Sequence, residues 1–178
     1  YNPTVSGNLK QVKRAFEQIE DAKRPVIYAG GGVIISDAAK ELTAFAHKLQ
    51  IPVTTTLMGL GGFPGTDPFS LGMLGMHGTY RANMAVTNCD LLLAVGSRFD
   101  DRVTGDVSKF AHQANIIHID IDPTSISKNV KVDIPIVADC KHALASMNNW
   151  FERTDSFDAK AEKEKHAPWL EEIKAWKN

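Results

Sequence analysis

The sequence contains little cysteine and no long apolar run. Only Cys89 and Cys140 carry a thiol, and they form neither a CxxC pair nor a zinc-ligand spacing. A disulfide framework is therefore excluded, and we expect a reducing, cytoplasmic setting. No apolar run is long enough to cross a bilayer and no signal peptide is evident, so we expect no membrane partner.

An excess of charge of either sign is also lacking. The 20 Lys and Arg residues and the 21 Asp and Glu residues give a formal net charge of −1. This balance provides no general attraction to nucleic acid, so we expect no nucleic-acid partner. The length of 178 residues and the apolar fraction of 43% allow one domain with a sizeable core. Because the chain begins with Tyr1 rather than Met, we interpret it as an excerpt from a longer protein.

Catalytic motifs are absent as well. The sequence holds no P-loop, no nucleophile elbow and no zinc motif, so we assign no catalytic residue and no metal ligand. The dinucleotide fingerprint GxGxxG is incomplete, because Ile35 stands where its third glycine belongs. No acidic residue follows the second predicted strand, which ends in Thr54, Thr55 and Thr56. An ordinary NAD-binding unit is therefore disfavoured.

What the sequence does contain is an alternation of apolar runs and amphipathic segments. Such an alternation predicts an α/β fold, a three-layer, doubly wound, Rossmann-like parallel sheet with right-handed crossovers in a single domain. The predicted strands are residues 25–29, 51–54, 91–95, 116–121 and 134–138. The predicted helices are residues 8–22, a helix capped by Ser36 or Asp37 that runs to Leu49, a helix from Thr79 or Tyr80 to Asn88, and residues 141–151.

Two segments fall outside this alternation. Residues 55–78 are rich in glycine but keep many large apolar side chains, so we interpret them as a shaped loop near a ligand, with room for a sixth short strand. We place the domain at residues 1–151, with residues 1–7 as its entry linker, and residues 152–178 as a charged linker to 165 and a short helix from Pro168. The apolar stripe of that helix either docks on another domain or packs back on the core; its residues are Trp169, Leu170, Ile173 and Trp176.

The segment after the third predicted strand carries the strongest binding signal. Leu91–Val95 is apolar throughout, so we expect a parallel strand that is covered on both faces of the sheet. Gly96 ends this run. Arg98 and Arg102 follow, interleaved with Asp100 and Asp101. Two guanidinium groups at the carboxyl end of a parallel strand offer a bidentate site for an anion. The alternative is a solvated loop with internal Arg–Asp pairs.

Other strand ends carry further features. Gly30, Gly31 and Gly32 follow the first strand and predict a turn whose N–H groups cradle phosphate, or simply a tight turn. Alternation puts His118, Asp120 and Asp122 on one face of the fourth strand, where Asp120 suits ribose hydroxyls and Asp122 suits a helix N-cap. A metal site from these three is a poorer alternative. Asp139, after the fifth strand, either accepts from ribose hydroxyls as Asp120 does or caps the next helix. For His77 we expect a contact with the ligand and no proton transfer.

Because the carboxyl ends of parallel strands share one edge of a sheet, these features line up along a single edge. A pyrophosphate, ribose hydroxyls and flat rings would all find partners there. The sequence therefore predicts a site for an extended dinucleotide.

Four runs resemble the large, catalytic subunit of the acetohydroxyacid synthase (acetolactate synthase) family. They are LMGLGGFPG (57–65), LGMLGMHGTYRAN (71–83), AVGSRFDDRVTG (94–105) and HIDIDPTSISKN (118–129). The resemblance covers most of residues 1–151 and corresponds to the middle of three domains of a thiamine-diphosphate enzyme. It implies a six-stranded Rossmann-like sheet that binds FAD.

The resemblance also implies where each part of FAD lies. Gly30, Gly31 and Gly32 would lie against the pyrophosphate or ribityl region, and Thr56, Leu57 and Met58 would line the extended cofactor. The flavin side would contact Leu74, Gly75, Met76, His77 and Gly78. The central part would be held by Gly96, Arg98, Asp100, Arg102 and Val103, with Arg102 near the active-site channel. The adenosine part would be surrounded by Asp120, Ile121 and Asp139.

The family's reaction is the decarboxylation of pyruvate and its condensation with a second 2-keto acid in branched-chain amino acid synthesis, without net redox at FAD. The family places the glutamate that activates thiamine diphosphate, and the motif for Mg2+ and diphosphate, in the flanking domains, so this chain alone is expected to be catalytically silent. The implied partners are those flanking domains, further catalytic subunits in a homo-oligomer, and a small regulatory subunit. The alternatives are another thiamine-diphosphate carboligase or oxidase, or a free-standing dinucleotide-binding module.

Overall fold

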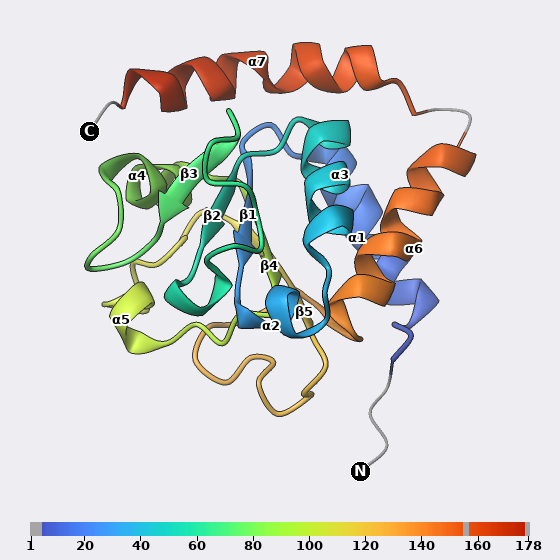
Figure 1. The fold of residues 1–178 in the computed structure, drawn as a ribbon, viewed down its shortest axis with the longest axis horizontal. Coiled ribbons are helices and arrows are strands. Elements are labelled where there is room, and N and C mark those ends of the chain that lie inside the picture. The colour runs from blue at the N-terminus through green and yellow to red at the C-terminus, as the bar shows by residue number, and fades with distance from the viewer. Residues whose placement is uncertain (1–4, 155–156, 177–178) are drawn as a thin grey trace.

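Six parallel strands form one sheet with helices on both faces (Figure 1). The computed structural model describes residues 5–154 and 157–176. The strand order is β3-β2-β1-β4-β5-β6, and every neighbouring pair is parallel. This confirms the predicted fold class. The strands are β1 Pro25–Ala29, β2 Val53–Thr55, β3 Ser70–Met73, β4 Leu91–Val95, β5 Asn115–Asp120 and β6 Ile134–Val137.

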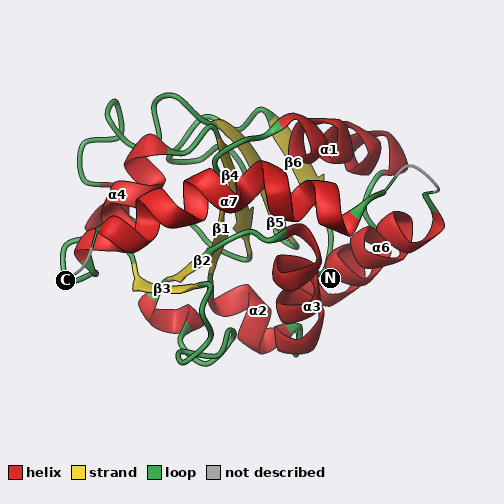
Figure 2. Cartoon of the chain, turned by 90° about the horizontal axis from the view of Figure 1, so that it is seen from above, coloured by secondary structure: helices red, strands yellow, loops and turns green. Residues whose placement is uncertain are grey.

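The helices form the outer layers of the domain. One apolar core joins α1, α3 and α6 to one face of the sheet, and a second core joins α4 and α7 to the other. In addition, α7 crosses the edge where the strands begin (Figures 1 and 2). The helices are α1 Leu9–Asp21, α2 Gly31–Ile35, α3 Ala39–Leu49, the 3-10 turn η1 Leu57–Gly59, α4 Tyr80–Asn88, α5 Asp101–Thr104, α6 Cys140–Arg153 and α7 Ala159–Ala175.

The two central strands match their predicted bounds residue for residue. All five residues of β1 and all five of β4 are buried, because the sheet is covered on both faces there. The sixth strand that the resemblance implies is β3, which lies in the glycine-rich segment. Helix α4 begins after Thr79, whose hydroxyl accepts from the N–H of Ala82. Near the other side of the sheet, β5 and β6 each end one residue earlier than predicted.

The connection between β1 and β2 differs from the prediction. Neither Ser36 nor Asp37 caps α3, which begins after Ala38 without a side-chain cap. The glycine triplet instead opens the short helix α2, and the Ser36 hydroxyl closes it by donating to the carbonyl of Gly32 at 2.7 Å. Strand β2 begins at Val53 rather than at Ile51, because the N–H of Ile51 is bonded back to helix α3.

The carboxyl-terminal part is more helical than predicted. Residues 159–165 were expected to be linker, but α7 begins at Ala159 and Pro168 lies inside it. A proline in a helix leaves the carbonyl four residues earlier without its N–H partner, here that of Glu164. Glu164 and Pro168 are both exposed, so this carbonyl lies on the solvent side of the helix, where the loss of its partner is tolerated.

The apolar stripe of α7 packs back on the domain, one of the two outcomes left open. Trp169 and Ile173 are buried in the second core, and the indole N–H of Trp169 donates to the carbonyl of Pro25 at 3.1 Å. The ring of His166 lies between the carbonyls of Leu49 and Ala22. No helix in the described ranges is long and apolar enough to span a membrane. Residues 1–4 of the predicted entry linker lie outside the described residues.

Candidate functional site

The candidate site is the edge of the sheet where the strands end, on the side opposite α7 (Figure 1). The chain winds outwards from the centre in both directions, so the strand order reverses between β1 and β4. In open α/β sheets the crevice outside such a reversal is where ligands bind. Gly30 follows β1 and Gly96 follows β4, and both therefore flank this switch point.

The glycines at the switch point pack against one another. A Cβ added to Gly30 would lie 2.2 Å from the carbonyl oxygen of Gly96, and one added to Gly32 would lie 2.6 Å from the Gly96 Cα. The N–H groups of Gly30 and Gly32 donate to the carbonyls of Val95 and Gly96. These two N–H groups are thus used internally, as in the tight turn that was the alternative to a phosphate cradle. Gly31 lies against Met58 instead.

The two predicted arginines are exposed to solvent, Arg98 just after β4 and Arg102 in α5. Their side chains are 70% exposed at Arg98 and 80% exposed at Arg102. The guanidinium of Arg98 lies 3.4 Å from the Asp100 carboxylate, and that of Arg102 lies 4.0 Å from Asp101. The internal pairs of the alternative interpretation are therefore present, but they are long and exposed. Such pairs hold their partners weakly, so an anionic ligand could displace them.

Two loops from distant parts of the sequence meet at this edge. The N–H of Met76 donates to the carbonyl of Arg102 at 3.2 Å, and a Cβ on Gly75 would lie 2.8 Å from the same oxygen. The structure thereby brings the predicted flavin-side residues, Leu74 to Gly78, next to Arg102 and Val103. Leu74 is buried, whereas Met76 and His77 are exposed.

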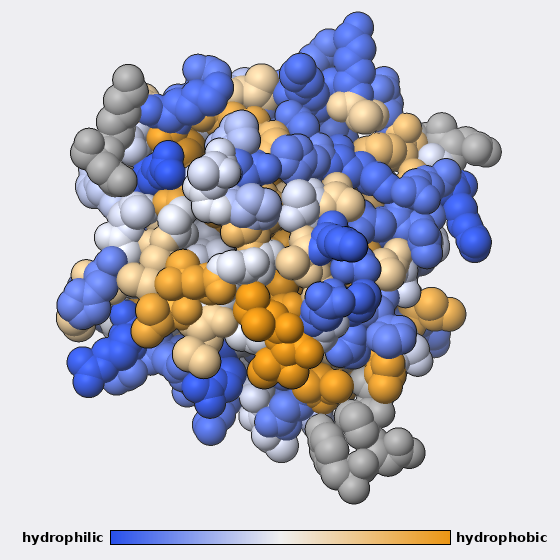
Figure 3. Space-filling view, in the orientation of Figure 1, coloured by the Kyte–Doolittle hydropathy of each residue, from blue (hydrophilic) through white to orange (hydrophobic). Residues whose placement is uncertain are grey.

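An apolar patch lies beside the glycine turns. Figure 3 shows it in the lower centre, where Figure 1 places α2 and the η1 turn. Thr56 starts this turn, and its hydroxyl accepts from the N–H of Gly59. Large exposed apolar side chains at the edge of a sheet mark a surface that a ligand or another domain covers. Within and next to α2 and η1, the side chains of Ile35, Leu57, Met58 and Leu60 are each more than half exposed.

Asp120 is nearly buried at the end of β5. One of its carboxylate oxygens accepts from the N–H of Asp122 at 2.8 Å, and the other lies 3.8 Å from the His118 ring. The carboxylate of Asp122 turns away and accepts from Thr124, in a turn that no helix follows, so the expected helix cap is wrong. The three side chains weighed as a metal site therefore do not converge. Within the described residues, no group of three or more His, Cys, Asp or Glu side chains could hold a metal ion.

Asp139 serves as the N-cap of α6, one of the two roles predicted for it. Its carboxylate accepts from the N–H of His142 at 3.1 Å. It lies two strands away from the switch point, beyond β5 and β6. Ile121, the residue after β5, is partly exposed.

Asp139→Ala is expected to lower the free energy of unfolding by about 1 kcal/mol, because it leaves an N–H of the first turn of α6 unpaired. Asp139→Ser should stay close to the original chain, since a serine hydroxyl accepts the same bond. Urea unfolding followed by circular dichroism measures both. Equal losses in the two variants would show that the carboxylate acts through something other than the cap.

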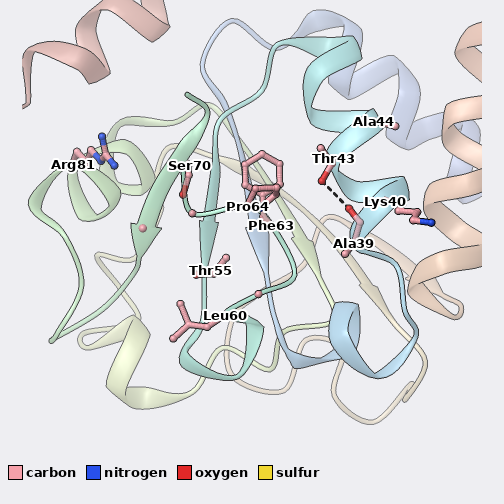
Figure 4. Close-up of a pocket in the computed structure, with 13 residues that line it drawn as sticks. Ala39, Lys40, Thr43, Ala44, Thr55, Leu60, Phe63, Pro64, Ser70 and Arg81 are labelled. Carbon is pink, nitrogen blue, oxygen red and sulfur yellow. Dashed lines mark hydrogen bonds between the residues drawn. The ribbon is translucent and has the colours of Figure 1, made fainter. Parts of the chain in front are cut away.

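A hollow of about 760 Å3 lies elsewhere on the surface. It opens between α3, β3 and the loop that holds Phe63 and Pro64, and none of the predicted site residues lines it. Figure 4 shows its two cations, Lys40 and Arg81, on opposite sides with their charged ends apart. A ligand site needs polar groups that converge, so we assign no ligand to this hollow.

Sequence reasoning missed two residues at the switch point. Ser97 is buried directly after Gly96, and its hydroxyl has no hydrogen-bond partner in the described part of the chain. Phe99 is also buried and has a left-handed backbone with φ of 53°. Glycine, asparagine and aspartate are the residues whose presence signals that conformation, so a phenylalanine gives no warning of it.

Residues 12–147 match the family model described as "Thiamine pyrophosphate enzyme, central domain". The chain is 48% identical over 177 residues to the acetolactate synthase large subunit of Buchnera aphidicola from Acyrthosiphon pisum, which covers 99% of the chain and 30% of the relative. Over 176 residues it is 47% identical to the acetolactate synthase isozyme 3 large subunit of Escherichia coli, with coverages of 99% and 29%. A probable acetolactate synthase large subunit of Methanocaldococcus jannaschii is 57% identical over 147 residues, with coverages of 83% and 25%. The chain therefore spans less than a third of the length of these curated relatives.

Proposed function

Because this chain belongs to the family of thiamine pyrophosphate enzyme central domains, we propose that it is the FAD-binding central domain of an acetolactate synthase large subunit. The observation that carries the proposal is a pair of exposed guanidinium groups, Arg98 and Arg102, beside the switch point of the sheet. Guanidinium groups bind phosphates through paired hydrogen bonds, and a dinucleotide brings a pyrophosphate. The similarity to acetolactate synthase large subunits adds support.

The residues at the edge fit an extended flavin dinucleotide in their chemistry. Ser97 directly follows Gly96 at the switch point, and its buried hydroxyl lacks a partner among the described residues. The free carboxylate oxygen of Asp120 would accept from a ribose hydroxyl. The exposed side chains of Leu57, Met58 and Met76 would cover flat rings.

For the whole protein we propose the acetolactate synthase reaction, in which pyruvate is decarboxylated and joined to a second 2-keto acid in branched-chain amino acid synthesis. Thiamine diphosphate, held with Mg2+ by the flanking domains, supplies the stabilised carbanion when it is bound. The residues of this chain hold and orient FAD and provide no proton donor or nucleophile for the reaction. The proposed partners are those flanking domains, further catalytic subunits and a small regulatory subunit.

FAD binding to the chain tests the proposal directly. Titration with FAD, followed by tryptophan and flavin fluorescence, should give a saturable change, and FAD should raise the thermal unfolding midpoint because it binds only the folded state. NAD is the matched control and should do neither, since the fingerprint for NAD is incomplete. Equal responses to both dinucleotides, or a response to neither, would contradict the proposal.

The catalytic part of the proposal has its own test. The chain, supplied with pyruvate, thiamine diphosphate, Mg2+ and FAD, should form no acetolactate, because the proposal places the groups that activate thiamine diphosphate in other domains. Acetolactate is measured by a colorimetric assay, with a complete acetolactate synthase as the positive control. Turnover by the pure chain would overturn the assignment of a binding role alone.

A further inference from the structure

Three consecutive backbone carbonyl groups after β4 each accept a hydrogen bond from a side chain of β5 or of the segment that follows it. The carbonyl oxygen of Ser97 lies 2.7 Å from Nε2 of His118 on β5. Those of Arg98 and Phe99 lie 3.2 and 3.1 Å from Nδ2 of Asn129, in the segment between β5 and β6. Contacts from two separate elements thus hold the backbone on both sides of Arg98.

The chemistry of these contacts determines which atoms donate. A carbonyl oxygen only accepts, so Asn129 must present its NH2 group and His118 must carry a proton on Nε2. Burial lowers the pKa of His118, which favours the neutral ring with this single proton. Its Nδ1 is accordingly left without a partner in the described structure. An oxygen in place of either donor would face a carbonyl oxygen and repel it.

The backbone at this point needs such support. Phe99 has the left-handed conformation that side chains disfavour. Its ring is anchored between those of Tyr28, His118 and Phe110, at centroid distances of 5.7, 5.1 and 5.9 Å. Arg98, by contrast, is exposed and holds only a long pair with Asp100. The hydrogen-bonded backbone therefore fixes where the Arg98 side chain starts.

We propose that Asn129 and His118 are positioning residues, which hold the Ser97–Phe99 backbone so that Arg98 stays at the carboxyl end of β4, beside the switch point. The proposal rests on the proposed function, because FAD is the ligand that Arg98 would bind. Asn129 is exposed and outside both apolar cores, so its amide can be changed without disturbing the packing of the sheet.

Asn129→Ala should weaken FAD binding by about fivefold, as expected when two hydrogen bonds to the backbone are lost. Asn129→Asp should weaken it at least as much, because its carboxylate has the shape of the amide but presents oxygen to the two carbonyls. The thermal unfolding midpoint should fall only slightly in Asn129→Ala, because Asn129 is exposed and water can replace its two hydrogen bonds. Ser125→Ala, in the same segment, is the matched control and should bind FAD as the original chain does. The dissociation constant from fluorescence titration is the measurement.

A double-variant cycle shows whether Asn129 acts through Arg98. In an Arg98→Ala background, Asn129→Ala should cause no further loss of affinity. Equal losses in both backgrounds would overturn the proposal, and so would full affinity in Asn129→Ala or Asn129→Asp. In those cases the proposed function stands as long as Arg98→Ala itself binds FAD more weakly. If the original chain binds no FAD, or if Arg98→Ala has no effect, it is the proposed function that has failed and the positioning role is overturned with it.

His118 is tested with a pair of variants. His118→Gln keeps an N–H donor for the carbonyl of Ser97 and should retain most of the FAD affinity, whereas His118→Leu should not. Because His118 is fully buried, the thermal midpoint of each variant is measured beside its affinity. Weak binding by a folded His118→Gln that equals that of His118→Leu would remove His118 from the positioning role.

Discussion

Arg98→Ala is expected to weaken FAD binding by about 10- to 100-fold, the loss typical of one hydrogen-bonded charged partner. The side chain is 70% exposed and its partner Asp100 lies 3.4 Å away, so the free energy of unfolding should change little. Fluorescence titration gives the dissociation constant, and urea unfolding gives the stability. The change should therefore appear in affinity alone.

Two further variants make this result specific. Arg98→Lys keeps the charge but loses the planar fork, so it should recover only part of the affinity. Arg14→Ala removes an exposed arginine of α1, away from the switch point, and should bind FAD normally. If the original chain and Arg98→Ala bind FAD equally well, Arg98 is not part of the cofactor site.

Gly30→Ala is expected to destabilise the fold by about 3 kcal/mol or more, at or above the upper end of the usual effect of overpacking. The added Cβ would lie 2.2 Å from the carbonyl oxygen of Gly96 and 2.6 Å from the Cα of Ser97. Both are backbone atoms, which cannot rotate away as a flexible side chain does. The ends of β1 and β4 would have to separate, and the switch point would open with them.

Gly65→Ala is the matched control for this variant. A Cβ at Gly65 would meet no atom within 4 Å, so the change should be neutral or slightly stabilising. The free energy of unfolding in urea is the measurement for both. Equal stabilities for the two variants would show that the contact between Gly30 and Gly96 is looser than described.

The carboxyl edge of the sheet and the hydrophobic patch beside it have a common physical cause. Glycines bring the backbones after β1 and β4 together, which places the turns of α2 and η1 at the surface. Several of their apolar side chains are therefore exposed and do not pack on the sheet. We infer that FAD and the proposed flanking domains bury these side chains in the whole protein.

Local patterns were sufficient for the elements whose residues agree with their surroundings. Leu91–Val95 and Pro25–Ala29 are apolar throughout, and central parallel strands are buried on both faces, so their bounds follow from composition. The motifs at 57–65, 71–83, 94–105 and 118–129 indicated the family, which the match over residues 12–147 confirms. The carboxyl-edge placement of Arg98 and Asp120 followed from the parallel sheet. Their contact with FAD stays a prediction.

The tertiary structure decided what depends on residues far apart in the sequence. Ser36 and Asp37 look like caps, but the packing of Gly32 against Gly96 forms α2 there and moves the start of α3. Pro168 looks like a helix start, but α7 begins nine residues earlier, because His166 is bonded to the ends of α1 and α3 and Trp169 to β1. Asn129 gave no local signal, because its role depends on carbonyls some thirty residues earlier in the chain. Periodicity and propensity act between near neighbours, whereas these contacts exist only once the sheet has brought its strand ends together.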